Sequence, residues 1–120
     1  MDEYKYLVTV ELAVYRGEKF LVMVRSDEED YAPGLLAYPG GKVEPGVVGM
    51  NVLEEAARRE LMEETGLTAR HLEYLESKSF EMHEGTFVMD VVFLAEAEPG
   101  EALVSDPHEV AELLWLTADE

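Results

Sequence analysis

One nine-residue stretch decides the fold and the candidate chemistry of this chain: Arg59-Glu60-Leu61-Met62-Glu63-Glu64-Thr65-Gly66-Leu67. Its three glutamates are spaced i, i+3 and i+4, so their side chains converge on one face of a helix. Like charges at this spacing destabilise a helix by roughly 0.2–0.5 kcal/mol per pair. A hard divalent cation with oxygen ligands would turn that cost into a gain. The stretch therefore predicts a helix that ends at Gly66 and presents a metal-binding face.

A glycine-rich segment precedes this helix and favours a metal site over the alternative of a solvated, charge-rich surface helix. It runs Tyr38-Pro39-Gly40-Gly41-Lys42-Val43-Glu44-Pro45-Gly46. Together the two segments resemble the Nudix box, whose usual form is Gly, five residues, Glu, seven residues, and then Arg-Glu-aliphatic-x-Glu-Glu-x-Gly-aliphatic. The chain matches the second half of this box at every fixed position from Arg59 to Leu67.

The first half of the box departs from the usual form. Counting back over seven residues from Arg59 places the family's glutamate at Asn51, whereas counting forward over five residues from Gly41 places it at Val47. A four-residue insertion, Val47-Val48-Gly49-Met50, reconciles the two counts, with Asn51 opening the helix as an N-cap. We expect the insertion to bulge out of the loop without moving the helix register. The three main metal ligands of the family are then present and one assisting carboxylate is missing.

The order of predicted elements is that of an α+β domain. Strands at Tyr4 to Tyr15 and Phe20 to Arg25 form a hairpin around a tight turn. Asn51 to Thr65 forms a helix whose apolar side packs on a sheet. The nearly continuous apolar run from Phe87 to Ala95 predicts a central strand. Other strands are expected at Leu67 to Met82, within Thr86 to Glu96, and at Leu113 to Leu116.

Length and composition predict a single domain over residues 1–120. With 48% hydrophobic residues the chain can bury a modest core, and it has no repeat or linker-like segment. The absence of cysteine means that a metal must use oxygen or histidine ligands. No apolar run approaches the roughly 20 residues of a membrane span, and the acidic start lacks a basic signal region, so a cytoplasmic protein is expected.

The charge balance limits the possible partners. Nine basic and 27 acidic residues give a formal net charge of −18. Such a field repels polyanions and argues against extended contact with nucleic acid. A small phosphorylated ligand accompanied by magnesium is compatible with it.

The resemblance implies a fold and an activity. Nudix enzymes have a mixed sheet between helices and use magnesium or manganese to hydrolyse a nucleoside diphosphate linked to another group. The expected fold is therefore a mixed sheet packed against the box helix. The usual C-terminal helix is truncated or absent, because the capping-box sequence Thr117-Ala118-Asp119-Glu120 ends the chain. The missing helix also favours a homodimer.

The expected activity is Mg²⁺- or Mn²⁺-dependent hydrolysis of the pyrophosphate linkage in a nucleoside triphosphate or related phosphoanhydride. The alternative is a nucleotide-binding or sensor module of the same fold, with catalysis impaired by the interrupted box.

The resemblance also implies roles for individual residues. Glu60, Glu63 and Glu64 match the metal ligands, and a backbone carbonyl at Gly41 completes the metal shell. Arg59 matches the arginine that orients these carboxylates through its planar fork. Of these residues, Glu63, Glu64 and Arg59 are the ones expected to act directly in catalysis.

The general base is expected in the segment before the last strand, from Asp106 to Glu112. Glu109 is the first candidate there and Glu112 the second. His83 and His108 are minor candidates, and Glu44 could also reach the metal from the glycine segment.

Substrate contacts are assigned from position in the chain. Arg25 and Lys42 are the candidate phosphate-binding cations, although both could equally be ordinary surface charges at strand ends. Tyr38, beside the glycine segment, is a candidate for stacking on a base, with Phe80, Phe87 and Trp115 as possible walls or simply core residues. Many relatives carry Trp three residues before the loop proline, where this chain has Leu36.

Overall fold

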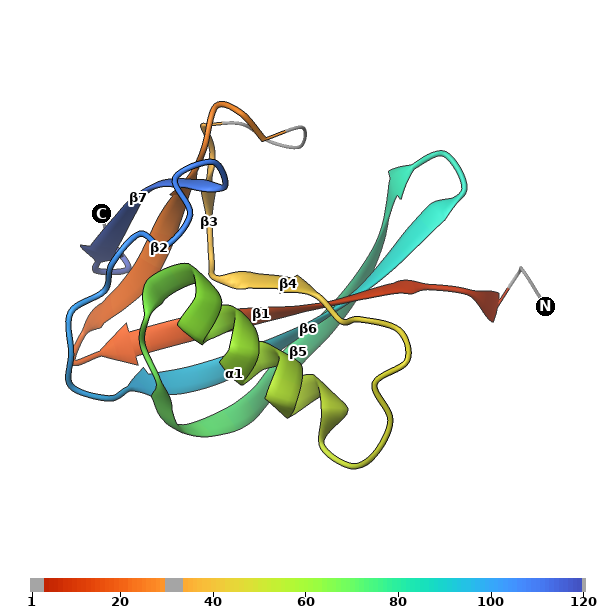
Figure 1. Ribbon diagram of the computed structural model, residues 1–120, viewed down its shortest axis with the longest axis horizontal. Coiled ribbons are helices and arrows are strands. Elements are labelled where there is room, and N and C mark those ends of the chain that lie inside the picture. Colours follow the sequence, from red (N-terminus) through yellow and green to blue (C-terminus); the bar gives the residue numbers. More distant parts are fainter. Residues whose placement is uncertain (1–3, 30–33, 120) are drawn as a thin grey trace.

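The computed structural model describes residues 4–29 and 34–119. Within these ranges the chain forms one helix and seven strands (Figure 1). In chain order they are β1 (Leu7–Arg16), β2 (Lys19–Arg25), β3 (Leu36–Ala37), β4 (Gly40–Lys42), α1 (Val52–Thr65), β5 (Ala69–His83), β6 (Thr86–Ala97) and β7 (Val110–Leu116). The predicted α+β class, the first hairpin and the helix are confirmed. No helix in the described part of the chain has the length and apolarity to cross a membrane.

The strands form one mixed sheet in the order β3-β2-β1-β6-β5, with β4 paired to β1 and β7 paired to β2. The β1–β6 pair is parallel and the others are antiparallel. Strand β6 lies between β1 and β5 and is buried along most of its length, as its apolar sequence predicted. The predicted mixed sheet packed against the box helix is therefore confirmed.

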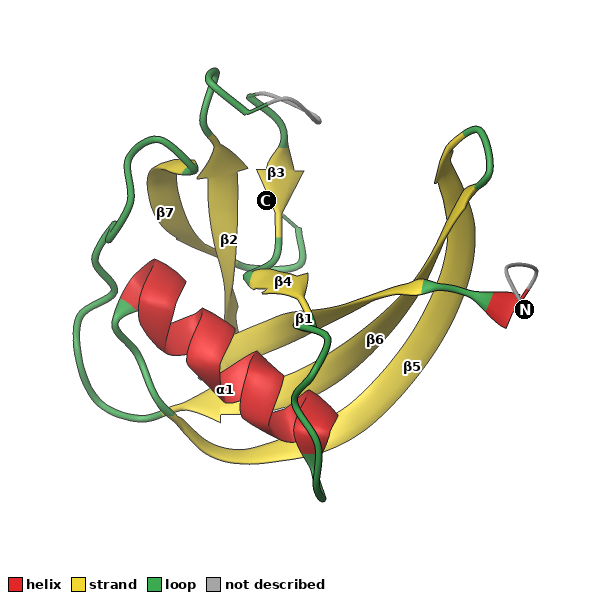
Figure 2. Cartoon of the chain, turned by 45° about the vertical axis from the view of Figure 1, so that its right-hand side comes forward, coloured by secondary structure: helices red, strands yellow, loops and turns green. Residues whose placement is uncertain are grey.

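The sheet forks beside β1. Strand β2 pairs with β1 only at Tyr15↔Phe20 and Arg16↔Lys19, next to their shared turn. Farther along, Thr9 to Glu11 of β1 pair with β4, while β2 pairs with β7 along almost its whole length. Figure 2 shows β2, β3 and β7 on one side and the long β5–β6 hairpin on the other. A cleft of about 1110 Å³ opens between them.

Helix α1 packs its small and apolar face on the sheet. Ala56, Ala57 and Leu61 are buried in a core that also contains Leu12 and Phe93. The helix ends at Gly66, whose φ of 75° is left-handed and whose N–H donates to the Met62 carbonyl. A glycine is suited to this end because the left-handed conformation costs it little.

The start of the helix differs from the prediction. Asn51 occupies the N-cap position, but its backbone is left-handed (φ 57°) and its side chain makes no capping hydrogen bond. The helix begins instead with the Glu55 N–H donating to the Asn51 carbonyl. The expected insertion lies in an exposed loop, with Val48 and Met50 88% and 85% exposed.

Two further segments differ from their predictions. The glycine segment contains a short strand, β4, because its backbone pairs with β1. The last strand begins at Val110, three residues before the expected Leu113, because Val110 already pairs with Arg25 at the end of β2. Residues 117–119 form no helix, and Glu120, the end of the expected capping box, lies outside the described residues.

Candidate active site

Two glycines of β4 let the helix approach the sheet. The Gly40 N–H donates to Glu64 Oε1 at 2.8 Å, so this buried carboxylate is anchored to the strand. A Cβ built on Gly41 would lie 2.5 Å from Glu60 Cδ, a distance that only a shift of Glu60 could relieve. Gly41 therefore leaves the space that Glu60 occupies, and Gly40 holds Glu64 through its backbone N–H.

Arg59 holds the other side of the glutamate cluster. Its Nη1 lies 3.1 Å from Glu60 Oε1 and 3.4 Å from Glu63 Oε1. The Glu63 side chain is 56% exposed, whereas that of Glu60 is 14% exposed. Arg59 thus contacts two of the three carboxylates.

Burial and mutual repulsion perturb this cluster. Burial raises the pKa of Glu64 to about 8, against the effect of the Gly40 hydrogen bond, and the charges of Glu60 and Glu109 add to the rise. The pKa of Glu60 is also raised, first by burial and also by Glu63 and Glu109, with Arg59 opposing. These carboxylates are therefore crowded together with too little positive charge, a situation that favours a bound cation.

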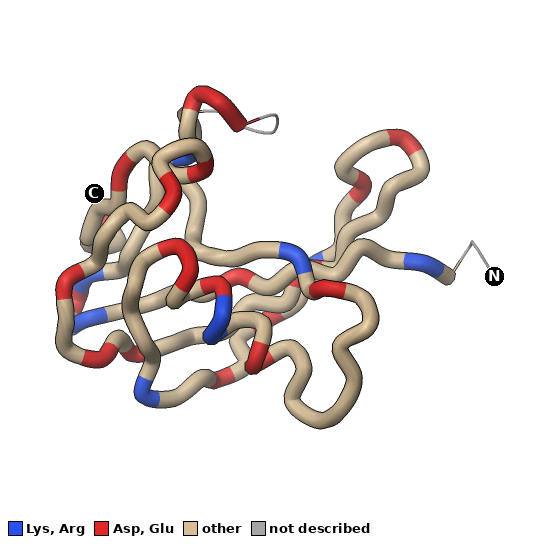
Figure 3. The backbone as a smooth tube through the Cα atoms, viewed as in Figure 1, with Lys and Arg blue, Asp and Glu red and all other residues tan. Residues whose placement is uncertain are grey.

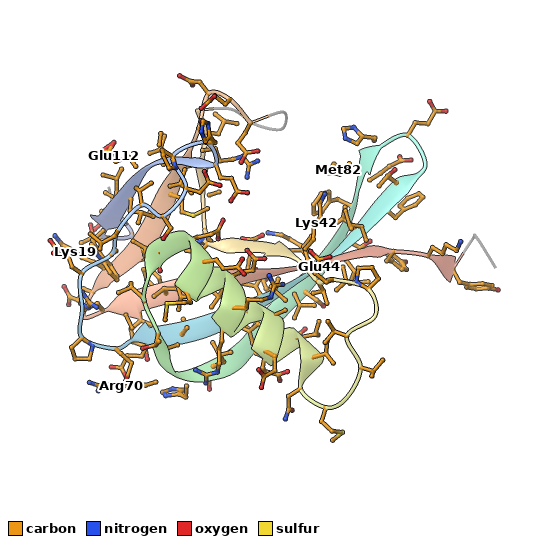
Figure 4. The ribbon with its side chains drawn as sticks, in the orientation of Figure 1. Lys19, Lys42, Glu44, Arg70, Met82 and Glu112 are labelled. Carbon is orange, nitrogen blue, oxygen red and sulfur yellow. The ribbon has the colours of Figure 1, made fainter. Side chains whose placement is uncertain are left out.

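The turn before β7 brings Glu109 to the same cluster. The Ser26 N–H donates to the Glu109 carbonyl at 2.9 Å, which ties this turn to the end of β2. The pKa of Glu109 is raised by burial and by neighbouring carboxylates, including Glu63, while Arg25 opposes the rise. Glu112 lies farther along, on β7 opposite Val24, and Figure 4 shows it well away from the glycine strand.

The minor candidates lie in different places. His108 is exposed, and its Nδ1 lies 2.9 Å from Glu28 Oε2. That carboxylate raises the pKa of His108. His83 lines the cleft. Glu44 is exposed and follows β4, beside the labelled Lys42 in Figure 4.

The donors in this cluster suit a hard divalent cation. Glu60, Glu63 and Glu64 supply carboxylate oxygens and Gly41 a backbone carbonyl, which are the ligand types that Mg²⁺ takes. Among residues 4–29 and 34–119, no three acidic or histidine side chains are already arranged around a common metal position. Arg59 contacts both Glu60 and Glu63, so the guanidinium occupies part of the space between these carboxylates.

The cleft joins this cluster to the face of the sheet. Arg25, Tyr38 and Lys42 all line it, together with Gly40 and Glu64. Arg25 Nη2 also lies 3.6 Å from Glu29 Oε2. Figure 3 shows how few basic positions the backbone carries among its many acidic ones. Arg25 and Lys42 therefore belong to a small set of cations that could contact a phosphate.

Some of the candidate aromatic residues line the cleft and others do not. Phe80 lines the cleft, and so does Leu36. Trp115 packs against the core and has the Arg16 guanidinium 4.8 Å from its ring centroid. Phe87 is 47% exposed and is not among the cleft-lining residues.

Three charged residues of the cleft were not predicted from the sequence. Glu11, Lys78 and Asp90 lie on β1, β5 and β6 and face the cleft. Asp90 interrupts the apolar run from Phe87 to Ala95, and Glu11 interrupts an apolar strand in the same way. A charge in the middle of a buried strand was the available signal, because such a residue requires a partner or a function.

Comparison with solved structures supports the fold. The crystal structure of a MutT NUDIX hydrolase from Burkholderia pseudomallei superposes with a TM-score of 0.83 at 26% identity, covering 97% of this chain and 86% of that one. The MutT protein of Methanosarcina mazei superposes with a TM-score of 0.81 at 27% identity, covering 98% and 80%.

Sequence relatives support the same assignment. The chain is 38% identical over 101 residues to the oxidized purine nucleoside triphosphate hydrolase of Danio rerio, covering 83% of this chain and 60% of that protein. It is 30% identical over 109 residues to the NAD-capped RNA hydrolase NudC of Escherichia coli O157:H7, covering 91% and 38%. It therefore spans less than two thirds of the length of either relative. The family model of the NUDIX domain matches residues 5–120. The chain belongs to the NUDIX family.

Proposed function

We propose that the chain hydrolyses the pyrophosphate linkage of a nucleoside triphosphate or a related nucleoside diphosphate derivative, with Mg²⁺ or Mn²⁺ as cofactor. The observation that carries this proposal is the convergence of Glu60 and Glu64 on the Gly40-Gly41 strand at one end of a large cleft. The charges of Glu109 and Arg25 also act on Glu64, Glu109 raising its pKa and Arg25 lowering it.

The metal would be held by Glu60, Glu63, Glu64 and the Gly41 carbonyl. When bound, it supplies charge neutralisation for the phosphate oxygens and lowers the pKa of a water nucleophile. The raised pKa values of Glu60 and Glu64 fit this assignment, because a cation would stabilise the ionised carboxylates against the burial, and the smaller mutual repulsion, that raise them.

The remaining residues position the substrate and move the proton. Arg25 and Lys42 place positive charge along the cleft, where they can contact phosphate oxygens. Glu109 accepts the proton of the attacking water, and its raised pKa makes it a better base than an ordinary carboxylate. Arg59 orients Glu60 and Glu63 through its ion pairs with both.

The relatives support a nucleotide substrate. One is named for oxidized purine nucleoside triphosphates and the other for NAD-capped RNA, and both kinds of substrate contain a phosphoanhydride. The large cleft, with Tyr38 and Phe80 on its walls, suits a substrate with an aromatic base. A cytoplasmic location and a homodimer remain predictions.

The alternative is a nucleotide-binding module that does not hydrolyse its ligand. Two observations favour it: Asn51 stands where the family carries a glutamate, and no three described carboxylates are arranged around one metal position. Both functions predict nucleotide binding, and only the enzyme predicts turnover.

A panel of nucleoside triphosphates, dinucleoside polyphosphates and nucleotide sugars, assayed with and without Mg²⁺, tests the proposal. We expect metal-dependent release of phosphate or pyrophosphate from at least one compound. Glu63→Gln and Glu64→Gln should lower kcat/KM about 10³-fold, since a bound metal contributes several kcal/mol. Glu55→Gln is the matched control, because Glu55 is an exposed glutamate on the same helix.

Mg²⁺ should also raise the Tm of the wild-type chain and not that of Glu64→Gln, because a ligand that binds the folded state stabilises it. Tight nucleotide binding without turnover of any compound would instead establish the binding module.

A further inference from the structure

A row of polar residues crosses the floor of the cleft. Thr9 on β1 pairs with Lys42 on β4 and with Asp90 on β6, and Asp90 pairs in turn with Lys78 on β5. Directly paired residues on neighbouring strands share one face of a sheet. All four line the cleft, and Figure 2 shows their strands side by side. The row therefore places a carboxylate between two ammonium groups.

The carboxylate of this row has an unused acceptor. The Asp90 side chain is 3% exposed, and its Oδ1 accepts a hydrogen bond of 2.6 Å from Thr9 Oγ1. Its Oδ2 has no hydrogen-bond partner among the described residues while Glu11 is ionised, whereas a protonated Glu11 hydrogen-bonds to Asp90. Lys78 Nζ is 3.8 Å from this atom and closer to Glu11 Oε1, at 3.4 Å. A buried acceptor without a donor is costly, so a ligand N–H would be favoured at this position once the Lys78 side chain turns aside to admit it.

An apolar row lies next to the polar one. Val88 pairs with Leu7 on one side and with Phe80 on the other, two residues farther along the same three strands. All three residues line the cleft, as does Met82, which Figure 4 labels on the β5–β6 hairpin. An apolar surface beside a short row of hydrogen-bonding groups suits a flat heterocycle that packs by its face and bonds by its edge.

We propose that Asp90 and Lys78 form a base-recognition subsite selective for nucleobases with a lactam edge, in which a ring N–H stands next to a carbonyl. This inference rests on the proposed function, since it names the class of base that the same cleft accepts. Guanine, hypoxanthine and uracil have such an edge, whereas adenine and cytosine present a ring nitrogen lone pair and an amino group.

The chemistry of the row explains the selectivity. A carboxylate only accepts and an ammonium only donates hydrogen bonds. Asp90, in the middle of the row, therefore takes the ring N–H of a lactam edge, and Lys78 at its end takes the carbonyl. Adenine or cytosine in the same orientation would direct a lone pair at Asp90 and an amino group at Lys78. A site that leaves its buried polar groups unpaired with the wrong ligand rejects that ligand.

Two pairs of nucleotides isolate the lactam edge. Inosine and adenosine triphosphates differ only there, and so do uridine and cytidine triphosphates. Calorimetric titration with their α,β-methylene analogues, in the presence of Mg²⁺, measures binding without turnover. We expect the lactam member of each pair to bind at least about tenfold tighter, the scale of one hydrogen bond to a charged group.

Three variants assign this preference to residues. Asp90→Asn should remove most of it, because an amide can also donate to a ring nitrogen. Lys78→Met should weaken the lactam analogues about tenfold and leave the adenine and cytosine analogues unchanged. Arg70→Met is the matched control, since Arg70 is on the same strand with the same 52% side-chain exposure but does not line this cleft. It should bind all four analogues as the wild type does.

The outcomes separate the subsite from the activity. Equal affinity of the wild type within both pairs would overturn the subsite, even if the chain hydrolyses nucleotides. An equal loss for all four analogues in Asp90→Asn and in Lys78→Met would also overturn it and assign both residues a structural role. A lactam preference in a chain without turnover would support the subsite and reject the enzyme.

Discussion

The two ends of the cleft are built in opposite ways. The helix end gathers Glu60, Glu63 and Glu64 from a single turn and a half of α1. The sheet end joins Thr9 to Asp90, which lie 81 positions apart in the chain. The charge cluster on the helix thus depends on local conformation, whereas the polar row depends on strand pairing. Substitutions at the helix end should mainly change activity, and those at the sheet end should change stability as well.

The largest effect is expected where the two ends meet, at the neighbouring glycines of β4. In Gly40→Ala the new Cβ would press against the Val10 backbone carbonyl, which cannot move without breaking the β1–β4 pairing. We expect the free energy of unfolding to fall by about 3 kcal/mol, at the upper end of overpacking costs. In Gly41→Ala the Cβ would meet only the flexible end of Glu60.

Gly41→Ala should therefore stay within about 1 kcal/mol of the wild type in stability and lose hydrolysis, because Glu60 is displaced. Urea denaturation and a hydrolysis assay on both variants test the contrast. Equal stability of the two variants would show that the glycines have the same role.

An intermediate effect is expected at the sheet end from Thr9→Val. Valine keeps the shape but removes the hydroxyl that donates to Asp90 Oδ1, and so leaves a buried carboxylate oxygen without a donor. The free energy of unfolding should fall by about 2 kcal/mol, measured by urea denaturation. Thr9→Ser keeps the hydroxyl and serves as the control. A fully stable Thr9→Val would mean that strand pairing does not need this bond.

The smallest effect is a pH dependence at Glu11. Burial, followed by the neighbouring Asp90 carboxylate, raises the pKa of Glu11 from its ordinary value of 4.5 to about 7, while Lys78 opposes the rise. Between these values the folded chain keeps a proton that the unfolded chain has lost. The contribution of Glu11 to the free energy of unfolding therefore falls as the pH rises through this window.

Glutamine does not titrate, so Glu11→Gln should gain on the wild type between pH 5 and pH 8. The gain should be on the order of 1 kcal/mol, since the ion pair with Lys78 is lost at the same time. Thermal melts of both proteins across this range measure the difference. A constant difference would show that Glu11 titrates alike in the folded and unfolded chain.

The contrast between the two ends also explains which features could be predicted from the sequence. The helix and its carboxylate face follow from residue spacing over nine positions, and Gly66 marks the end, so local rules were sufficient. Glu109 could be named only through the family resemblance. The polar row could not be foreseen, because nothing local indicates that Thr9 and Asp90 are partners in a parallel pair. Likewise, the left-handed backbone of Asn51 reflects the loop before it and not the capping preference of asparagine.

Residues of strand β1 lie at both ends of the cleft, so this strand sets the distance between the two ends. Thr9 of the polar row lies two residues from Glu11, which pairs with Gly40, the anchor of Glu64. Two residues of an extended strand span about 7 Å. The strand thus fixes the distance between the site for the base and the site for the phosphoanhydride. On this basis, a ligand with extra atoms between its base and its phosphoanhydride should be unable to contact both ends of the cleft at once.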